Sequence, residues 1–599
     1  MVRDRGRRQD DGHGRCRKDH RHGSLQLGRP QRADPDQNSK TGRRRRRRMT
    51  PLMEKTSRMK MIAKVASTAA LALALVACGK SGGGSGNTTT TAENTGPKLG
   101  IRPSGDETVG PDMSKIKNPD LPKVFDYIDK HIDEHVVNLQ KWIQQPSISN
   151  TGEGIQESAE MVKGFFDQLG CQKTQVYDVG KTKYGTQGNP VVYAKCDEGA
   201  KKTLIVYWQY DTMPVTQPDL WKAPPFEGRI VEQAPFKKVL IGRGAVNSKG
   251  GEMTFLNAVM SIKAVTGKLP VNIIFVAEGD EERMDIGLNK FMTEHMDLFA
   301  GADGVWGGGG SEGCVFVELK TSGKSWGRGP VYSDIHGGNK RSVDAPAWRH
   351  IQMLSKLVSE DGNKVLIPGN SPETEAALHK QAENYDLKRA AQNLGVARFI
   401  SDDPYTQLKM ARTGTSMNLD GIWGGNMFAG GSGAILPNQI ISKHNFRYMP
   451  NMKGPDIVKK LRKYLDQLGY KDVEINLVGD VPWAIRDRNN DQARAMTYAQ
   501  EIFTKPLTPG GTGAYWPAYL FSGIETNIDL PIAAVRGGTG GNAHAANEWY
   551  VIEGAGKQFG MATAEKLVAT ALYQYAGLNG PIIPAPAKPG ATDGGASGS

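Results

Sequence analysis

Five short segments place acidic, imidazole or guanidinium side chains at spacings that suit acid–base or metal chemistry. They are residues 207–214, 242–250, 278–282, 435–447 and 543–548. Carboxylates and imidazoles bind divalent cations, and a glutamate can carry a proton to and from reacting groups. Each segment alone is a weak signal. A doublet such as Glu281-Glu282 is usually a solvated surface pair, and a lone histidine such as His544 more often has a structural place.

Alternating helical and apolar segments would have to position these residues. The patterns predict a helix over 121–143, a strand over 203–207, a helix after Gly250 and a strand over 271–276. Strands that alternate with amphipathic helices are typical of an α/β domain with a largely parallel sheet. We therefore predict an α/β main domain without internal repeats.

A block in the middle of the chain follows a different pattern. Strand-like residues 315–319 and 440–448 alternate there with helix-like residues 345–357 and 455–468. This order predicts a small α+β domain inserted into the main domain. The α/β pattern then resumes and ends in a helix over about residues 555–576. We predict boundaries of 119–313 and 480–578 for the two parts of the main domain, and 314–479 for the insertion.

The order of the segments resembles that of a known enzyme family. Together with residues 221–228, they are similar to the motifs of the di-zinc aminoacylase, glutamate carboxypeptidase and cytosolic dipeptidase family (metallopeptidase family twenty), over residues 120–577. The resemblance implies an α/β, phosphorylase/hydrolase-like catalytic domain with a mostly parallel mixed sheet, and an inserted ferredoxin-like lid or dimerisation domain. It also implies a hydrolase of amide bonds in peptides or N-acyl amino acids, in which two zinc ions activate a water molecule.

Four residues keep the types that the resemblance implies for the reaction. Glu281 corresponds to the general base, which takes a proton from the water and passes it to the leaving amine. Glu282 and His544 correspond to two protein ligands of one metal ion. Asp211 corresponds to a carboxylate that orients a ligand histidine from outside the coordination sphere.

Three other positions depart from the family pattern. Gln209 stands where the family has a metal-binding histidine, and Asn247 stands where it has the aspartate that bridges the two ions. Gly309 stands where it has a third carboxylate, although the nearby Glu312 leaves this alignment open. Amide oxygens are poor zinc ligands, and two dications repel each other without an anionic bridge. We therefore predict that one site is lost and that at most one zinc or other divalent ion binds, with a metal-free protein as the alternative.

Three further residues correspond to family positions that contact the substrate. Arg447 corresponds to the arginine that holds a substrate carboxylate, a task that suits the guanidinium fork. His336 corresponds to a histidine that reaches the substrate carbonyl oxygen from the partner subunit, which implies a homodimer through the inserted domain. Thr512, in the glycine-rich segment 510–513, takes the place of a serine near the substrate.

The positive charge of the chain is concentrated at its N-terminus. The net charge is +13, and residues 1–48 alone hold 17 Lys or Arg against 6 Asp or Glu. A nucleic-acid-binding arm is one interpretation, but an export signal follows directly, so we favour a disordered basic extension or a translation start placed too early. Because the remaining chain is close to neutral, we expect no nucleic-acid partner for the main body.

Residues 49–78 resemble a bacterial lipoprotein signal. Four Lys or Arg residues between positions 55 and 64 precede a short apolar run, and residues 75–78 read Leu-Val-Ala-Cys, similar to a lipobox. A Gly/Ser/Thr-rich linker over 79–118 follows, and a disordered tail is predicted over 579–599. We predict lipidation at Cys78 and export to the cell envelope, with membrane contact through the lipid anchor only. An ordinary secretory signal with a chance cysteine is the alternative.

The remaining cysteines are Cys16, Cys171, Cys196 and Cys314. Their spacing forms neither a CxxC pair nor a metal-binding knuckle. A Cys171–Cys196 disulfide becomes possible after export, although the sequence alone does not require it.

These observations leave three functions open. The first is a hydrolase of peptides or N-acyl amino acids with an altered metal centre, which the retained Glu281, Glu282 and His544 favour. The second is a catalytically inactive cell-envelope protein that binds a small carboxylate-bearing ligand, which the substituted ligands favour. The third is a metal-free enzyme in which Glu281 is the acid or base of another reaction. A shared fold does not decide among them, because function depends on the chemistry of the site.

Overall fold

The computed structural model of the protein describes residues 107–367, 385–449, 452–486, 489–504 and 515–581. The predicted signal with Cys78 and the predicted substrate residue Thr512 therefore lie outside the described residues. Within the described part of the chain, no helix combines the length and apolar character that crossing a membrane requires.

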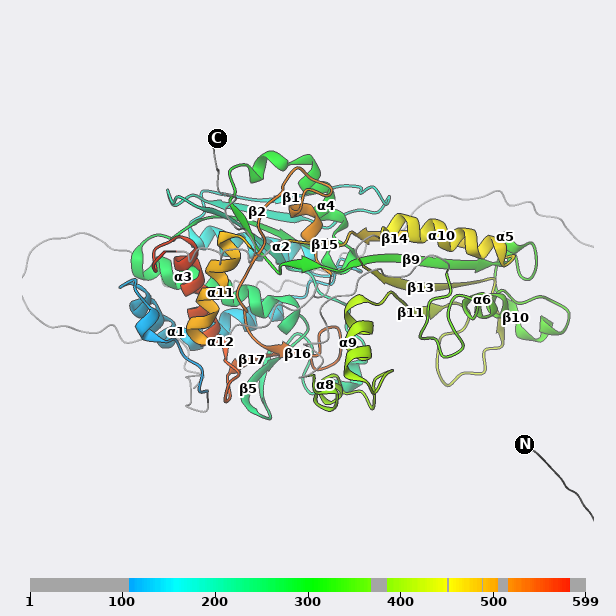
Figure 1. Ribbon diagram of the computed structural model, residues 1–599. Coiled ribbons are helices and arrows are strands. Elements are labelled where there is room, and N and C mark those ends of the chain that lie inside the picture. Colours follow the sequence, from blue (N-terminus) through cyan, green and yellow to red (C-terminus); the bar gives the residue numbers. More distant parts are fainter. Residues whose placement is uncertain (1–106, 368–384, 450–451, 487–488, 505–514, 582–599) are drawn as a thin grey trace, which may run out of the picture. The chain divides into compact units, whose positions relative to one another are not determined.

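A five-stranded mixed sheet forms the centre of the main domain (Figure 1). Its strand order is β1 (Lys173–Tyr177), β2 (Val191–Cys196), β6 (Asn272–Glu278), β3 (Thr203–Gln209) and β7 (Gly304–Trp306). β3 pairs in parallel with β6 and β7, whereas the β1–β2 and β2–β6 pairs are antiparallel. The predicted mixed sheet is present, but only half of its pairings are parallel. β3 and β6 are almost continuously apolar because both faces of the sheet are covered.

Helices cover one face of this sheet and make the larger core. In α1, apolar residues at Val124, Ile128, Ile132 and Val136 recur every four positions, so one side of the helix is buried against the sheet layer. On the opposite face, Ile205 and Ile274 pack against α4. The helices of the first face are α1 (Leu121–Gln144), α2 (Ile155–Leu169), α3 (Gly250–Thr266), α11 (Asp491–Phe503) and α12 (Met561–Tyr575), and α4 spans Ile286–Glu294.

A second, antiparallel sheet brings two distant motifs together. Its order is β16 (Gly540–Gly541), β17 (Trp549–Glu553), β5 (Phe236–Ile241) and β4 (Arg229–Gln233). Because β17 pairs with β5, the loop that follows β5 and the loop that precedes β17 meet at one end of the sheet. These loops contain the predicted motifs 242–250 and 543–548.

The inserted block forms the ferredoxin-like α+β domain that was predicted. Its four antiparallel strands have the order β11 (Ser416–Trp423), β13 (Gln439–Tyr448), β9 (Gly313–Ser322) and β14 (Glu474–Val481). The helices α6 (Pro346–Leu354) and α10 (Gly454–Gln467) lie on one face, where they bury alternate strand residues such as Val315, Val317 and Leu319 (Figure 1). The other face of this sheet is polar and includes Arg447.

Two short strands, β8 (Gly310–Ser311) and β15 (Ala484–Ile485), pair where the chain enters and leaves the inserted domain. β8 leads into β9, and β14 leads into β15. The two segments that connect the main and inserted domains therefore lie side by side. The remaining short elements are α5 (Gly323–Trp326), α8 (Leu387–Leu394), α9 (Pro404–Thr413), β10 (Ile335–His336) and β12 (Ile435–Leu436), with 3-10 turns at 113–115, 218–220, 281–283, 296–299, 337–341 and 518–521 and one π-helical turn at 245–249.

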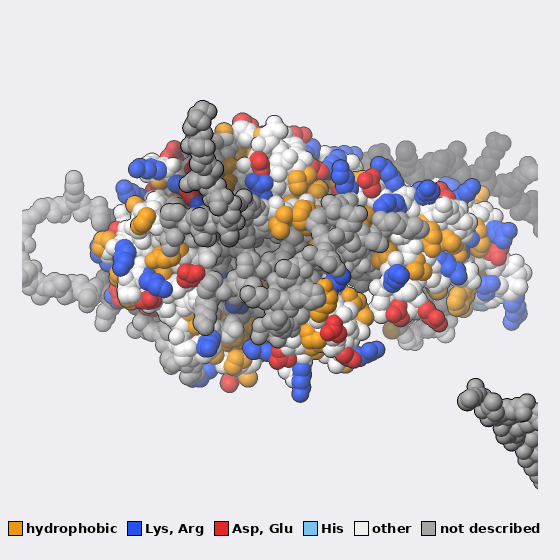
Figure 2. All heavy atoms as spheres, in the orientation of Figure 1, with side chains coloured by type: hydrophobic (Ala, Val, Ile, Leu, Met, Phe, Trp, Pro, Cys, Tyr) orange, Lys and Arg blue, Asp and Glu red, His pale blue; other side chains and the backbone are white. Residues whose placement is uncertain are grey.

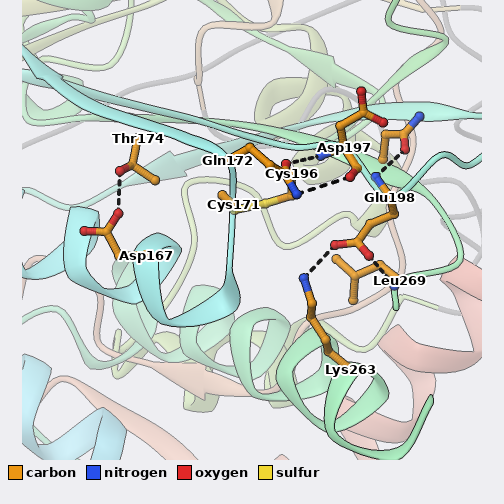
Figure 3. Close-up of a disulfide and its surroundings, with 10 residues drawn as sticks. Asp167, Cys171, Gln172, Thr174, Cys196, Asp197, Glu198, Lys263 and Leu269 are labelled. Atoms are coloured by element: carbon orange, nitrogen blue, oxygen red, sulfur yellow. Dashed lines mark hydrogen bonds and ion pairs between the residues drawn. A yellow bond between two sulfur atoms is a disulfide. The ribbon is translucent and has the colours of Figure 1, made fainter. Parts of the chain in front are cut away.

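A disulfide joins Cys171, just after α2, to Cys196 at the end of β2 (Figure 3). The neighbouring side chain of Gln172 reinforces the link, because it accepts a hydrogen bond from the Asp197 amide at 2.7 Å. The bond closes a loop of 25 residues and thereby stabilises the folded state against the unfolded chain.

On the face drawn in Figure 2, cationic and anionic side chains of the described residues are interspersed rather than gathered by sign.

Candidate active site

Glu281 and Glu282 lie in a tight turn shortly after β6. β3 and β6 are parallel neighbours, so their carboxyl ends place Asp211 next to this turn. The fully buried Asp211 carboxylate accepts hydrogen bonds from the backbone amides of Glu281 (3.2 Å) and Glu282 (3.1 Å). Asp211 therefore shapes the turn, and its backbone carbonyl lies 3.5 Å from Nε2 of Gln209. The predicted role of its carboxylate beside a ligand at position 209 stays a prediction.

Glu281 is a buried carboxyl with few compensating charges. Burial raises its pKa well above the usual range, and the negative charges of Glu282 and Asp211 raise it further. The positive charge of Arg447, in the inserted domain, lowers the pKa of Glu281. The raised pKa means that Glu281 holds a proton more readily than an exposed glutamate, as a group that exchanges protons with a substrate must.

His544 lies in the loop before β17, where its backbone has a φ of 64°. Its Nε2 atom is 2.9 Å from Oε1 of Glu282. This hydrogen bond is the main reason that the pKa of His544 is raised. The structure thus brings together the two retained candidate metal ligands, which are 262 positions apart in the sequence.

The Asn247 amide lies between these two residues. Its Nδ2 atom is 3.0 Å from Oε1 of Glu282 and 2.9 Å from Nε2 of His544. Both are hydrogen-bond distances, longer than the 2.0–2.2 Å of a zinc–ligand bond. An amide nitrogen therefore occupies the point that the two side chains share.

Glu548 holds the Asn247 loop in place, a role that the sequence did not reveal. Its carboxylate accepts hydrogen bonds from the backbone amides of Gly244, Val246 and Asn247, and it forms a buried ion pair with Arg243 at 2.8 Å. The only indication in the sequence that Glu548 belongs to the site was its position at the end of the 543–548 motif. A carboxylate bound to three backbone amides is visible only when both loops are in position.

Gln209 ends β3 and is also engaged by hydrogen bonds. Its Oε1 atom accepts from the Ser248 hydroxyl at 3.1 Å, and its Nε2 atom is 3.5 Å from Oε1 of Glu282. Gln209, Ser248, Asn247 and Glu282 thus form one continuous polar network. The network satisfies the amides without a cation.

The glycine run at 307–310 is covered by an aromatic ring. A Cβ atom at Gly307 would lie 2.5 Å from the ring of Trp516, and the Trp516 indole donates to the Gly310 carbonyl at 2.9 Å. At Gly309, the carbonyl oxygen accepts from the Arg486 amide at 3.0 Å. Glu312, the alternative to Gly309 in the alignment, forms an ion pair with Arg447 at 2.9 Å.

These residues do not fit a pair of divalent ions. Two ions need an anionic bridge and ligands on both sides, whereas the positions concerned hold Gln209, Asn247 and Gly309. Across the described ranges, no group of three or more His, Cys, Asp or Glu side chains is arranged to hold a metal ion. A single ion requires fewer ligands. Glu282 and His544 are in reach of one point, and a half-turn of the Asn247 amide would offer its oxygen there.

Arg447 lies near the end of β13, in the inserted domain. Its guanidinium forms an ion pair with Glu312 at 2.9 Å and lies 4.6 Å from the centre of the Tyr515 ring. Asn445, on the same face of β13, accepts a further bond from it at 3.3 Å. Arg447 is about one quarter exposed. A ligand carboxylate would therefore share this guanidinium with Glu312 or displace it.

The structure does not bring His336 to this site within one chain. It belongs to β10 and is exposed, and its Nδ1 atom accepts from the Gly338 amide at 3.1 Å. The predicted role of His336 requires a second subunit, so it stays a prediction.

The whole-chain comparisons agree with this architecture. The model of the family described as "Peptidase family M20/M25/M40" matches residues 205–569, more than half of the chain. The chain belongs to this peptidase family. Membership places it among hydrolases of the metallo-exopeptidase type, which act on amide bonds and generally use divalent metal ions.

Several family members resemble the chain over most of their length. The Cys-Gly metallodipeptidase DUG1 of Candida albicans is 26% identical over 72% of this chain and 93% of its own. The human Beta-Ala-His dipeptidase is 26% identical over 72% of this chain and 90% of its own. The solved structure of an M20 family metallo-carboxypeptidase, Sso-CP2 from Sulfolobus solfataricus, is 27% identical with a TM-score of 0.61, covering 74% and 99% of the two chains. The crystal structure of human carnosine dipeptidase 1 gives a TM-score of 0.65 at 22% identity, covering 76% and 99%, and shows the same fold.

Proposed function

We propose that this chain hydrolyses dipeptides or N-acyl amino acids that carry a free carboxylate, with at most one divalent ion, such as zinc, at Glu282 and His544. One observation carries the proposal: the turn that holds the buried carboxyl of Glu281 also places Glu282 2.9 Å from His544. A proton-carrying group and two metal-binding side chains therefore meet at this turn, and Arg447 supplies a carboxylate-binding group from the inserted domain. This set suits the cleavage of an amide bond next to a terminal carboxylate.

Each of these residues has a separate role in the proposed reaction. Arg447 binds the ligand carboxylate and so fixes the scissile bond relative to Glu281. Glu281 takes a proton from the attacking water and returns it to the leaving amine. Asp211 positions Glu281 through the backbone of the turn. A single bound ion would supply Lewis acidity toward the scissile carbonyl.

A second candidate function has its own support. Because Glu282 accepts hydrogen bonds from both the Asn247 amide and His544, its carboxylate has hydrogen-bond partners without a metal ion. This arrangement favours a cell-envelope protein that binds a small carboxylate-bearing ligand at Arg447 and does not cleave it.

Metal analysis combined with a hydrolysis assay separates the two functions. With zinc added in excess, we expect the purified mature chain to bind close to one zinc ion, and to hydrolyse Cys-Gly, β-Ala-His or a related dipeptide in a reaction that a chelator abolishes. A chain that carries no metal and cleaves no dipeptide, but melts at a higher temperature with one of these ligands, would instead establish the binding function.

We also propose that the chain is exported and anchored to the bacterial cell envelope through a lipid on Cys78. The basic segment, the short apolar run and the Leu-Val-Ala-Cys sequence at 75–78 support this. The Cys171–Cys196 disulfide is consistent with folding outside the cytoplasm. Metabolic labelling with palmitate should mark the wild-type chain and not Cys78→Ser. Equal labelling of the two would contradict the anchor.

A further inference from the structure

A cavity of about 280 Å³ lies beside Glu282, between the catalytic turn and the polar face of the inserted sheet. Glu282, Arg283 and Met284 line one side of it. Glu318 of β9 and Lys443 of β13 line the other. The lining of the cavity includes Glu282 but not Arg447.

Lys443 is a cation of this cavity that the proposed mechanism does not use. It shares one face of β13 with Asn445 and Arg447, because alternate residues of a strand point the same way. Lys443 is directly opposite Glu318 in the strand ladder. Nevertheless, Glu318 accepts its hydrogen bond from Asn476 at 3.2 Å, and none of the residues that the structure describes forms an ion pair with Lys443. Its ammonium is therefore available to an anion in the cavity.

Two cations, Lys443 and Arg447, lie four residues apart on the same face of β13. Lys443 shares its cavity with Glu282, while Arg447 pairs with Glu312 at 2.9 Å. The Cα atoms of Lys443 and Arg447 are four residues apart along the strand, which corresponds to about 14 Å. An extended dipeptide spans about 7 Å, and the side chains of the ligand and of the protein extend over the remainder. A ligand with carboxylates at both ends would thus reach both cations with its amide bond over the glutamates.

We propose that this cavity is the subsite for an acidic N-terminal residue of a dipeptide. Lys443 binds the side-chain carboxylate of that residue, and Glu318 receives its α-ammonium group. The inference rests on the proposed hydrolysis of dipeptides, and it names the substrate class: an aspartyl or glutamyl residue joined to a second residue whose terminal carboxylate binds Arg447. When a ligand supplies the charged partner of an unpaired cation in a partly enclosed cavity, this ion pair contributes more to the free energy of binding than an exposed ion pair does.

The test compares two nearly isosteric dipeptides, Asp-Ala and Asn-Ala. In the wild-type protein we expect kcat/KM to be roughly 10-fold higher for Asp-Ala, the effect of one hydrogen bond to a charged group. In Lys443→Gln this ratio should fall close to one. The matched control is Lys320→Gln, which removes a lysine of the same sheet that pairs with Glu474 at 3.1 Å and lies outside the cavity. The control should keep the wild-type ratio.

Each of the other outcomes would contradict either the subsite or the proposed function. Equal kcat/KM for the two dipeptides in the wild type, or an unchanged ratio in Lys443→Gln, would overturn the subsite while the hydrolase remains. A protein that cleaves neither dipeptide, nor any other dipeptide tested, would overturn the proposed function, and binding constants for the same pair would then decide the subsite. The melting temperature of Lys443→Gln shows whether the variant is folded, and because the readout is a ratio, loss of active protein does not imitate the effect.

Discussion

Replacing Asn247 by aspartate should convert a weak or absent metal site into a tight one. In the native chain, the Asn247 amide nitrogen donates a hydrogen bond to Glu282 and lies 2.9 Å from Nε2 of His544. A carboxylate at this position offers lone pairs and a negative charge to a cation at the same point. Groups that only orient a ligand change metal affinity by 10- to 100-fold, so we expect a direct anionic ligand to tighten zinc binding by more than about 100-fold.

Zinc content measured after dialysis against free ion is the direct readout for Asn247→Asp. The triple variant Gln209→His, Asn247→Asp and Gly309→Asp should take up still more, toward two ions per chain. A second readout is the melting temperature of Asn247→Asp. Without metal, the new carboxylate at position 247 would face Glu282 at hydrogen-bond distance, so like-charge repulsion should lower the melting temperature, and zinc should then raise it more than in the wild type.

Asn339→Asp is the matched control for this charge. It adds one carboxylate to an exposed turn of the inserted domain, and zinc uptake should stay at the wild-type level. If the triple variant takes up no more zinc than this control, the assignment of positions 209, 247 and 309 to the metal centre is wrong.

The second large effect is expected at Glu281. Glu281→Gln keeps the shape of the side chain and removes its ability to carry a proton. A positioned general base contributes about 10²- to 10⁴-fold, so we expect kcat to fall by that factor. The binding of a dipeptide should change far less, because Arg447 and the cavity beside Glu282 remain intact. Single-turnover kinetics and calorimetric binding measure the two quantities separately.

Glu294→Gln provides the comparison, since Glu294 ends α4 and pairs with Lys290 on the surface. This variant should keep the wild-type kcat. Hydrolysis by Glu281→Gln at the wild-type rate would mean that another group carries the proton.

Local patterns were sufficient to predict several of the helices and strands of the main domain. The apolar periodicity over 121–143 corresponds to α1 (Leu121–Gln144), and the run over 271–276 corresponds to β6 (Asn272–Glu278). Such patterns work because burying one face of a helix or both faces of a strand constrains neighbouring residues in the sequence. The prediction of a mostly parallel sheet was wrong for β1 and β2, because strand direction depends on connections that no local pattern contains.

The amino-acid sequence by itself determined the family, through the order of its motifs, and the residue types at positions 209, 247, 281, 282 and 544. Only the tertiary structure decided what these residues contact. It placed the Asn247 amide between Glu282 and His544, turned Asp211 toward the backbone of the 281–282 turn, and paired Glu312 with Arg447. The reason is physical. Residue type sets which bonds a side chain can make, whereas its partners are set by loops and strands that come from distant parts of the chain.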